Sequence, residues 1–201
     1  GRGRAGVFPG AQWSRLEGHA GAGATLGLVG CGRVGQAVAR RARGFDMRIV
    51  YADPRPLAPA EEAALGATRA ALHNVLAAAD FVSVHVPLAP ATRHLIGARE
   101  LERMKPTAYL VNTSRGPIVE EKALVAALTA GRIAGAARDV FEHEPRVAPE
   151  LLAMPNVVFT PHIGSGEVEL RERMADVVVD NILAVLAGRR PPNCANPEVF
   201  G

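Results

Sequence analysis

Residues 27–35 read GLVGCGRVG, and this stretch decides the fold. Gly30, Gly32 and Gly35 stand in G-x-G-x-x-G register between a short apolar run, TLGLVG, and a helix-like stretch, QAVARRARGF. Glycine at these positions allows a tight turn, lets backbone N–H groups approach a pyrophosphate, and lets the helix pack closely on the strand. The pattern alone is weak evidence in a chain with 21 glycines, so the neighbouring elements must support it.

The next apolar run, MRIVYAD, provides that support. It ends at Asp53, 18 residues after Gly35, close to the spacing at which an acidic residue meets the adenosine ribose of a bound dinucleotide. A carboxylate there accepts hydrogen bonds from both ribose hydroxyls and repels a 2′-phosphate. The alternative is that Asp53 is a simple turn residue before Pro54. Arg55 is a nearby cation that suits a phosphate, so NAD is the favoured cofactor and NADP the alternative.

The rest of the chain alternates short apolar runs with amphipathic stretches, which predicts a doubly wound α/β domain with a parallel sheet of the Rossmann type. Expected strands cover residues 25–30, 47–53, 81–88, 108–114, 133–141 and 156–161, and expected helices cover 36–45, 72–80, 98–104, 120–131 and 167–188. The predicted organisation is an irregular N-terminal arm (1–23), a dinucleotide-binding domain (24–167) and a C-terminal helix and tail (168–201).

Ligands of such sheets bind outside the carboxyl ends of the strands, at the point where strand order reverses. The residues expected at those ends are Gly30, Asp53, Pro87, Asn112, Asp139 and His162.

The composition excludes several classes of protein. The 201 residues suffice for one domain with a substantial core, and the net charge is only +3, with scattered arginines and no long basic track for nucleic acid. The two cysteines form neither a disulfide framework nor a metal-ligand pattern, so no metal is predicted and a reducing, cytoplasmic location is the default. We expect neither secretion nor a membrane span, because no signal peptide and no long apolar run is present.

Two further segments contain residues that indicate a substrate-binding and catalytic site. Arg115 follows the apolar run AYLVNTS, where a guanidinium can grip a carboxylate in a bidentate manner and polarise an adjacent carbonyl; a salt bridge to a neighbouring helix is the alternative. Glu144, in DVFEHEP, can lie beside His162, in NVVFTPHIGS, and a carboxylate bonded to an imidazole gives an acid usable near neutral pH. Of the other histidines, His143 is expected to be exposed and His85 to be a packed wall residue. His19, His73 and His94 have no partner pattern and are expected to be solvated or in the core.

The ordered motifs GLVGCGRVG, YADP, HVPLAPATRHLIG, MKPTAYLVNTSRGPIVEEKAL, DVFEHEP and TPHIGS resemble the NAD-binding domain of the D-isomer-specific 2-hydroxyacid dehydrogenases, from Trp13 to Val199. The sequence PNVVFTPHIGS followed by VELRERM is most similar to the glyoxylate and hydroxypyruvate reductase branch.

The resemblance implies hydride transfer between NAD(H) and a small 2-keto or D-2-hydroxy acid. It implies that Arg115 binds the substrate carboxylate and keto oxygen, that His162 donates the proton, and that Glu144 is the partner of His162. The implied cofactor contacts are Gly30, Gly32, Arg33, Val34 and Gly35 at the pyrophosphate, Asp53 at the ribose, Pro87 and Leu88 on the adenine side, Thr113, Ser114, Arg115, Asp139 and His162 near the nicotinamide half, and Gly164 and Ser165 closing over it.

The sequence also departs from the family. Arg138 stands where the family usually has an apolar residue, which is expected to place a charge close to the nicotinamide pocket, and Cys31 replaces a usual aliphatic residue. The substrate domain that precedes this domain in the family is expected to be absent, so the chain is either a fragment of a longer enzyme or a cofactor-binding remnant. The long helix predicted near residues 168–187 would then expose its apolar face or use it in association.

Two classes of function remain at this point: a reductase of small 2-keto acids, or its cofactor-binding half, and a non-catalytic NAD-binding sensor or corepressor-like module. The set Arg115, Glu144 and His162 favours the enzyme, because a sensor needs no paired acid. Glu144 disfavours a formate-type dehydrogenase, which carries a glutamine there, whereas phosphite oxidation stays open. The family dimerises through this domain, so a homodimer is expected, with the arm around Trp13 contributing.

Overall fold

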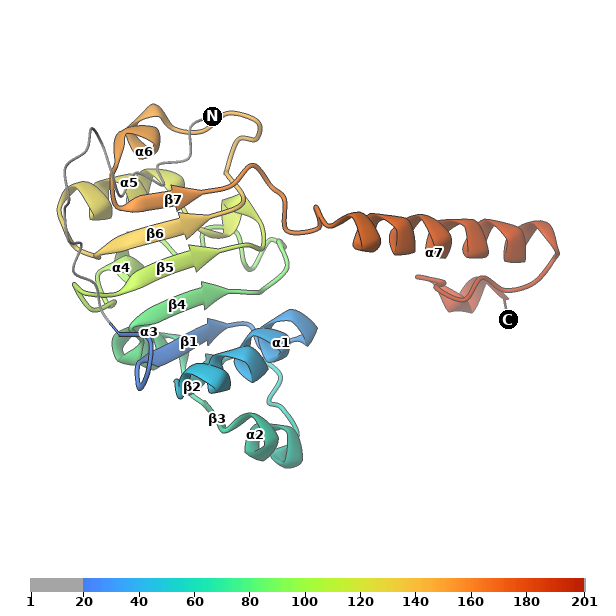
Figure 1. Ribbon diagram of the computed structural model, residues 1–201, viewed down its shortest axis with the longest axis horizontal. Coiled ribbons are helices and arrows are strands. Elements are labelled where there is room, and N and C mark those ends of the chain that lie inside the picture. The colour runs from blue at the N-terminus through green and yellow to red at the C-terminus, as the bar shows by residue number, and fades with distance from the viewer. Residues whose placement is uncertain (1–19, 201) are drawn as a thin grey trace, which may run out of the picture.

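Short apolar runs form a seven-stranded sheet in which every strand is parallel to its neighbours (Figure 1). The computed structural model describes residues 20–200; most of the predicted N-terminal arm, including Trp13 and His19, lies outside them. The strands are β1 (Thr25–Val29), β2 (Arg48–Ala52), β3 (Ala67–Arg69), β4 (Phe81–Val84), β5 (Tyr109–Asn112), β6 (Gly135–Arg138) and β7 (Val157–Phe159). Their spatial order is β3-β2-β1-β4-β5-β6-β7, which confirms the predicted doubly wound parallel sheet.

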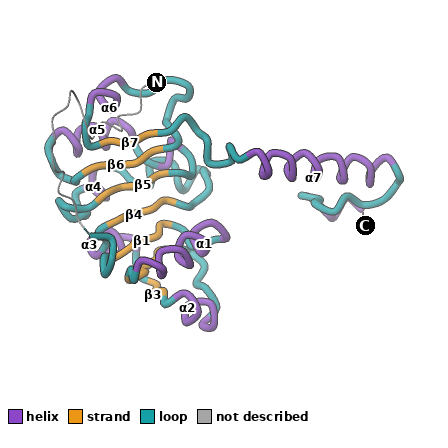
Figure 2. Tube along the Cα trace, in the orientation of Figure 1, coloured by secondary structure: helices purple, strands orange, loops and turns teal. Residues whose placement is uncertain are grey.

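Helices cover both faces of the sheet (Figure 2). The helices are α1 (Arg33–Ala42), α2 (Pro59–Leu65), α3 (Leu72–Ala78), α4 (Ala98–Leu101), α5 (Glu121–Thr129), α6 (Pro149–Ala153) and α7 (Val168–Leu186), with short 3-10 turns at Arg43–Phe45, Gly116–Ile118 and Pro197–Phe200. One core cluster joins α1 and α2 to β1 and β2, and a larger cluster joins α3, α4, α5 and α6 to the other face. β1 is buried along its whole length, as expected for the centre of a sheet covered on both sides.

The register of the sheet brings the strand ends to one edge. Reading across the sheet from β2 to β7, the row of paired residues is Ala52, Val29, Val84, Asn112, Arg138 and Phe159. The residues that follow this row are Asp53, Gly30, His85, Thr113, Asp139 and Thr160. Because all strands run the same way, these residues emerge together, and the reversal of chain order lies between β1 and β4.

Three short elements, α2, β3 and α6, were not predicted from the sequence. Each has seven residues or fewer, and β3 has only three. Segments of this length have little intrinsic preference, and their stability comes from tertiary packing. Leu65 of α2 and Leu151 of α6 are the buried residues that provide it.

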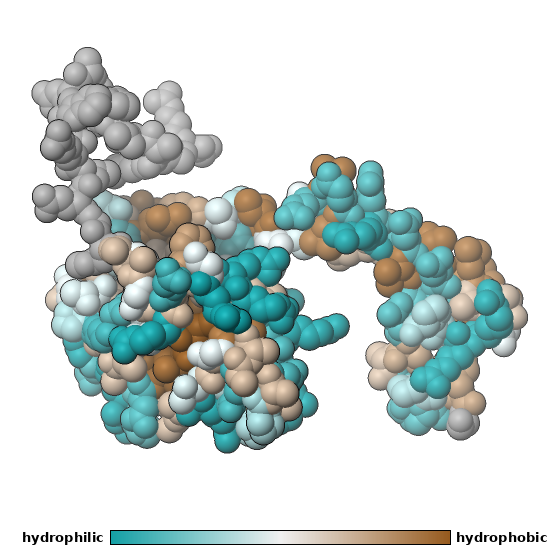
Figure 3. Space-filling model, turned by 60° about the horizontal axis from the view of Figure 1, so that its bottom comes forward, coloured by the Kyte–Doolittle hydropathy of each residue, from teal (hydrophilic) through white to brown (hydrophobic). Residues whose placement is uncertain are grey.

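Helix α7 projects away from the sheet, and the C-terminal tail folds back beside it (Figure 1). Asn181 of α7 and Asn193 of the tail bond each other, the Asn193 N–H donating to Asn181 Oδ1 at 2.9 Å. Ala184 is the buried residue of the helix, whereas Val178 and Leu186 are 57% and 78% exposed. Figure 3 shows hydrophobic residues interleaved with hydrophilic ones along this projection. The expected exposure of the helix's apolar residues is therefore observed.

Candidate functional site

The glycine-rich turn connects β1 to α1, and two of its glycines are required by space. A Cβ on Gly30, whose φ is +93°, would lie 2.9 Å from the backbone of His85, and a Cβ on Gly35 would lie 2.5 Å from the Gly30 carbonyl oxygen. A Cβ on Gly32 would meet nothing within 4 Å. Gly32 is the residue before α1, where no side chain caps the free N–H groups of the helix. The turn therefore leaves open space in front of unpaired backbone donors, which is the arrangement that receives a phosphate anion.

Apolar side chains are exposed around this opening. Val34, in the first turn of α1, is 62% exposed, and Leu88, after β4, is 41% exposed. Arg33 and Pro87, the neighbouring members of the predicted cofactor set, are also exposed. Exposed apolar groups around a polar cradle are typical of a site for an amphipathic small molecule.

Asp53 emerges from β2 beside the same turn. Its Oδ2 accepts from the Cys31 N–H at 2.9 Å, and its Oδ1 accepts from the Arg55 N–H at 2.9 Å. The carboxylate is thereby joined to the glycine-rich turn, next to the place where an acid at this spacing meets a ribose. Cys31 beneath it is buried, and burial together with Asp53 raises the pKa of the Cys31 thiol to about 11, so this thiol stays protonated at neutral pH.

Asn112, which was predicted as a strand end but was given no role, shapes the segment that presents Arg115. It is fully buried at the end of β5; its Nδ2 donates to the Arg115 carbonyl at 3.0 Å, and its Oδ1 accepts from the Ser114 N–H at 3.0 Å. Ser114 Oγ also donates to the Val86 carbonyl at 2.5 Å. The segments after β4 and β5 are thus joined, with Thr113 exposed between them. An asparagine at a strand end was the only sign of this role in the sequence.

Arg115, which follows the end of β5, is exposed. Its Nη1 donates to the Ser114 carbonyl at 2.7 Å, and within residues 20–200 it forms no ion pair, so the predicted alternative of a salt bridge to a helix is wrong there. The strand ends three residues earlier, at Asn112, so Arg115 lies outside the sheet. An exposed guanidinium without a carboxylate partner is available to bind an anion.

Asp139 holds the loop that contains the predicted catalytic histidine. Its Oδ1 accepts from Thr160 Oγ1 at 2.5 Å and from the Ile163 N–H at 2.9 Å, and its Oδ2 accepts from the Gly164 N–H at 2.9 Å. Burial alone would raise the pKa of Asp139, but these hydrogen bonds lower it below its ordinary value. Asp139 is therefore a buried carboxylate that fixes residues 160–164 relative to β6, with the half-buried Ser165 next in the chain.

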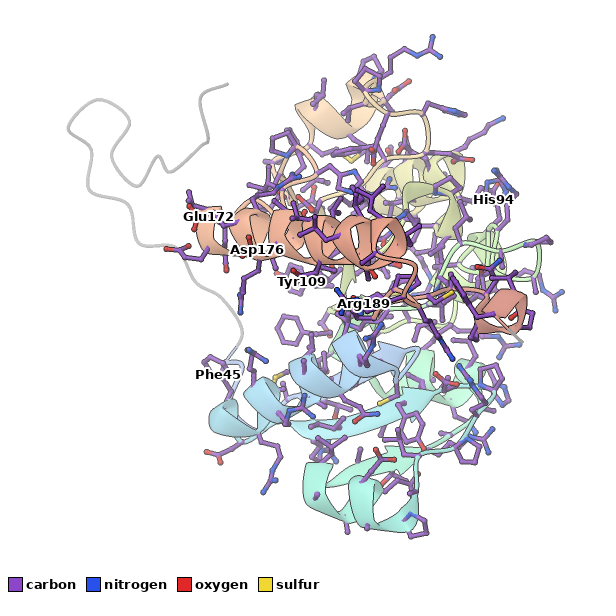
Figure 4. All side chains as sticks on the ribbon, turned by 90° about the vertical axis from the view of Figure 1, so that its right-hand side faces the viewer. Phe45, His94, Tyr109, Glu172, Asp176 and Arg189 are labelled. Atoms are coloured by element: carbon purple, nitrogen blue, oxygen red, sulfur yellow. The ribbon has the colours of Figure 1, made fainter. Side chains whose placement is uncertain are left out.

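We predict that Asp139→Asn lowers the free energy of unfolding by about 1–3 kcal/mol at pH 7, because an amide cannot accept all three bonds. Since the folded-state pKa is lowered, the contribution of Asp139 is present above its ordinary pKa and is lost as the pH falls through the folded value. The difference between the variant and the unaltered chain should therefore shrink below about pH 4. Urea unfolding at several pH values measures this difference in the free energy of unfolding. Asp176→Asn, on the exposed face of α7 (Figure 4), is the control; a difference that does not change with pH would contradict the prediction.

Glu144 and His162 meet in the structure, although they lie 18 residues apart in the chain. Glu144 Oε2 is 2.8 Å from His162 Nδ1, and Glu144 Oε1 accepts from the Phe141 N–H at 2.9 Å. The hydrogen bond with His162 is the main reason that the pKa of Glu144 lies below its ordinary value. His162 has a φ of +54°, an uncommon conformation for a residue with a side chain. With Nδ1 held by Glu144, the imidazole has only Nε2 left for a reactant.

Arg138 does not point toward the expected nicotinamide pocket, and that expectation was wrong. Its side chain, 1% exposed, runs to the face covered by α5, where Nη1 lies 2.9 Å from Glu121 Oε2. Burial lowers the pKa of Arg138, whereas the neighbouring carboxylates raise it, Glu121 most strongly. Alternate residues of a strand face opposite sides, so the side chain of Arg138 falls on the opposite face from that of Asp139. A carboxylate at the start of α5 neutralises the charge.

His94 also has a partner that the sequence did not predict. Its Nε2 lies 2.6 Å from Glu142 Oε1, and Glu142 Oε2 accepts from the Glu121 N–H at 2.9 Å. Figure 4 shows His94 at the edge of the body, far from Phe45. Of the other histidines, His143 is exposed, as predicted, and His85 follows β4 half-buried, where burial lowers its pKa.

A hollow of about 850 Å³ lies beside β7 and α6, and its mostly apolar lining includes Glu144 and His162. No residue of the glycine-rich turn lines it, so it is separate from the opening at the switch point. In residues 20–200, no group of three His, Cys, Asp or Glu side chains is placed to hold a metal ion. No helix in the same range is long and apolar enough to cross a bilayer.

Residues 4–164 match the family described as "D-isomer specific 2-hydroxyacid dehydrogenase, NAD binding domain". The chain belongs to this family. A glyoxylate reductase of Thermococcus litoralis is 49% identical to this NAD-binding domain over 89% of the chain and 54% of the relative. A solved glyoxylate reductase from Paecilomyes thermophila superposes with a TM-score of 0.80 at 41% identity, covering 84% of this chain and 51% of that one.

A third relative was solved with its cofactor. The NAD complexed form of a D-isomer specific 2-hydroxyacid dehydrogenase from Lactobacillus delbrueckii ssp. bulgaricus gives a TM-score of 0.77 at 34% identity, over 86% of this chain and 56% of that one. The chain spans about half the length of the curated relatives it matches. The predicted resemblance to the family, and to its glyoxylate reductase members, is confirmed.

Proposed function

We propose that this chain is the NAD(H)-binding half of an oxidoreductase that interconverts small 2-keto acids, such as glyoxylate or hydroxypyruvate, and D-2-hydroxy acids. The observation that supports this most strongly is the Glu144–His162 pair, at 2.8 Å, on the same sheet edge as the glycine-rich turn. A non-catalytic NAD sensor, the alternative, has no use for a paired acid.

The cofactor site is proposed at the opening between β1 and β4. Gly30, Gly32 and Gly35 with Arg33 and Val34 would hold the pyrophosphate, and Asp53 the adenosine ribose. Pro87 and Leu88 would flank the adenine side, and Thr113, Ser114 and Asp139 the nicotinamide half. The open space in front of Gly32 and the free N–H groups of α1 fit a dinucleotide phosphate. When bound, NAD(H) supplies the hydride chemistry.

The protein's own groups would bind the substrate and move the proton. Arg115, exposed and without a carboxylate partner in residues 20–200, would bind the substrate carboxylate and polarise its keto oxygen. His162, positioned through Nδ1 by Glu144, would protonate that oxygen from Nε2 as the carbonyl is reduced. In the reverse direction the same nitrogen would accept the hydroxyl proton. Gly164 and Ser165 would close the loop over the nicotinamide.

The finer organisation is also part of the proposal. We propose that residues 24–167 form the cofactor domain and that residues 168–201 form a separate helix and tail. Homodimerisation is proposed because α7 exposes apolar residues that an association would cover. A cytoplasmic location is proposed because Cys31 and Cys194 are both free thiols.

The cofactor site is tested by Gly32→Ala. The φ of −73° at this position suits alanine and the space is open, so the fold and the melting temperature should be unchanged. The added methyl group would occupy the space proposed for the pyrophosphate, and we expect the Kd for NADH to rise at least about tenfold. Calorimetric titration with NADH measures it, and absorbance at 340 nm after adding glyoxylate then tests turnover.

Gly44→Ala is the matched control, since a Cβ there also meets nothing within 4 Å and Gly44 lies at the far end of α1. Unchanged NADH affinity in Gly32→Ala would show that the pyrophosphate does not bind at this turn. Failure of the unaltered chain to bind NADH would overturn the proposed function of the chain.

A further inference from the structure

Arg69, the last residue of β3, adjoins the strand that ends at Asp53. It pairs with Tyr51 of β2, and the Ala70 N–H donates to the Tyr51 carbonyl at 2.9 Å. β3 is the edge strand on this side of the sheet. The side chain of Arg69 therefore starts one strand outward from the proposed ribose-binding acid.

The guanidinium of Arg69 is held in place by backbone carbonyls. Nε and Nη2 donate to the Asp53 carbonyl at 3.1 and 2.9 Å, and Nη2 also donates to the Pro54 carbonyl at 3.1 Å. These contacts fix the charged group against the turn that follows β2, although the residue is exposed. They use one edge of the guanidinium and leave Nη1 without a hydrogen bond within residues 20–200.

The charge of Arg69 is not neutralised locally. No carboxylate in the described part of the chain lies within ion-pair distance of it. The acids of the neighbouring helix α2 are used elsewhere: Glu61 Oε2 accepts from the Ala58 N–H at 3.0 Å, and Glu62 Oε1 accepts from the Tyr51 hydroxyl at 2.6 Å. The Asp53 carboxylate is engaged by the N–H groups of Cys31 and Arg55.

We infer that Arg69 determines cofactor selectivity: it binds the 2′-phosphate of NADPH, so that the chain accepts NADPH as well as NADH despite Asp53. The inference rests on the proposed cofactor function. The Asp53 carboxylate would accept a hydrogen bond from the 2′-hydroxyl of NADH and would repel a phosphate. The immobilised guanidinium beside it attracts that phosphate and presents free Nη1 donors. A side chain already ordered by its own backbone loses little freedom when it binds the anion.

Arg55 is the second cation of this turn, and it allows a guanidinium that is held in place to be compared with one that is not. Its backbone N–H is bound to Asp53, whereas its side chain is exposed and makes no hydrogen bond within residues 20–200. We therefore expect the contribution of Arg55 to NADPH binding to be smaller than that of Arg69.

The experiment is calorimetric titration of the 201-residue chain with NADH and with NADPH, at low and moderate salt. In the unaltered chain we expect the two Kd values to lie within about tenfold of each other. In Arg69→Ala the Kd for NADPH should rise about tenfold or more, and that for NADH less than about twofold. Arg69→Lys, which keeps the charge but not the planar fork, should fall between the two. Arg99→Ala, an exposed arginine on α4, should change neither Kd.

The selectivity ratio separates this role from a structural one. If Arg69→Ala weakened the binding of NADH and of NADPH equally, Arg69 would only stabilise the turn at Asp53. That result would overturn the inference. Tight NADH binding with no NADPH binding in the unaltered chain would overturn the inference and leave the proposed function intact. Failure of both cofactors to bind would overturn both.

Discussion

Replacing Gly116 with alanine is expected to lower the free energy of unfolding by at least about 3 kcal/mol, because the added methyl group would overlap the main chain of a neighbouring segment. A Cβ on Gly116 would collide with the carbonyl of Phe141 and would lie 2.6 Å from the Glu142 nitrogen. Backbone atoms cannot rotate away as a flexible side chain can. For a domain of this size, the loss corresponds to a fall in melting temperature of roughly 6–12 °C.

Neither segment can move freely to relieve this overlap. The Arg115 carbonyl, next to Gly116, is held by the buried Asn112, and Phe141 follows β6, which pairs with β5. Movement would also separate Arg115 from the loop that leads to Glu144. Gly116→Ala should therefore lose any substrate-dependent activity together with stability. Differential scanning calorimetry measures the melting temperature.

Gly44→Ala is the control for this prediction as well, because it makes the same chemical change where a Cβ meets nothing within 4 Å. Its stability should be unchanged or raised by up to about 1 kcal/mol, since alanine has fewer unfolded conformations than glycine. A Gly116→Ala protein that melted within about 2 °C of the unaltered chain would show that the two segments separate easily.

The fold could be predicted because its signals are local and repeated. The glycine register, the apolar runs and the amphipathic stretches each indicate one unit of a β-α-β arrangement, and together they specify a parallel sheet. The elements that were missed, α2, β3 and α6, are too short to show a period. Strand ends were less reliable than strands: the run predicted over residues 81–88 stops at Val84, and His85 follows it, still donating its N–H to the Val29 carbonyl of β1.

The candidate site could be predicted only where a recognisable sequence motif indicates it. Asp53 and the glycines follow from spacing along the chain, whereas the pairing of His94 with Glu142 joins residues 48 positions apart. Nothing local in either segment indicates such a pair. Arg138 was misplaced for a related reason, since its direction depends on which face of β6 it occupies and on Glu121, 17 residues away.

The other large effect is expected at His162. In a chimera that joins this chain to the part of the Thermococcus litoralis glyoxylate reductase that it does not match, His162→Ala should reduce kcat for glyoxylate reduction by about 10²–10⁴-fold. The variant removes the proposed proton donor and one implied contact to the nicotinamide half, while the cofactor opening between β1 and β4 stays intact. The Kd for NADH should therefore change far less than kcat, and loss of turnover with retained binding would assign the proton to this imidazole.

The chain offers a matched control in the same site. His143 lies one residue before Glu144, is exposed, and makes no side-chain hydrogen bond within residues 20–200, so His143→Ala should keep kcat within about twofold of the unaltered chimera. Glu144→Gln should lose part of the activity, because the amide cannot stabilise the protonated imidazole as the carboxylate does. A His162→Ala chimera that kept more than about a tenth of the turnover would place the proton donor elsewhere, since general acid catalysis alone is worth at least about a hundredfold.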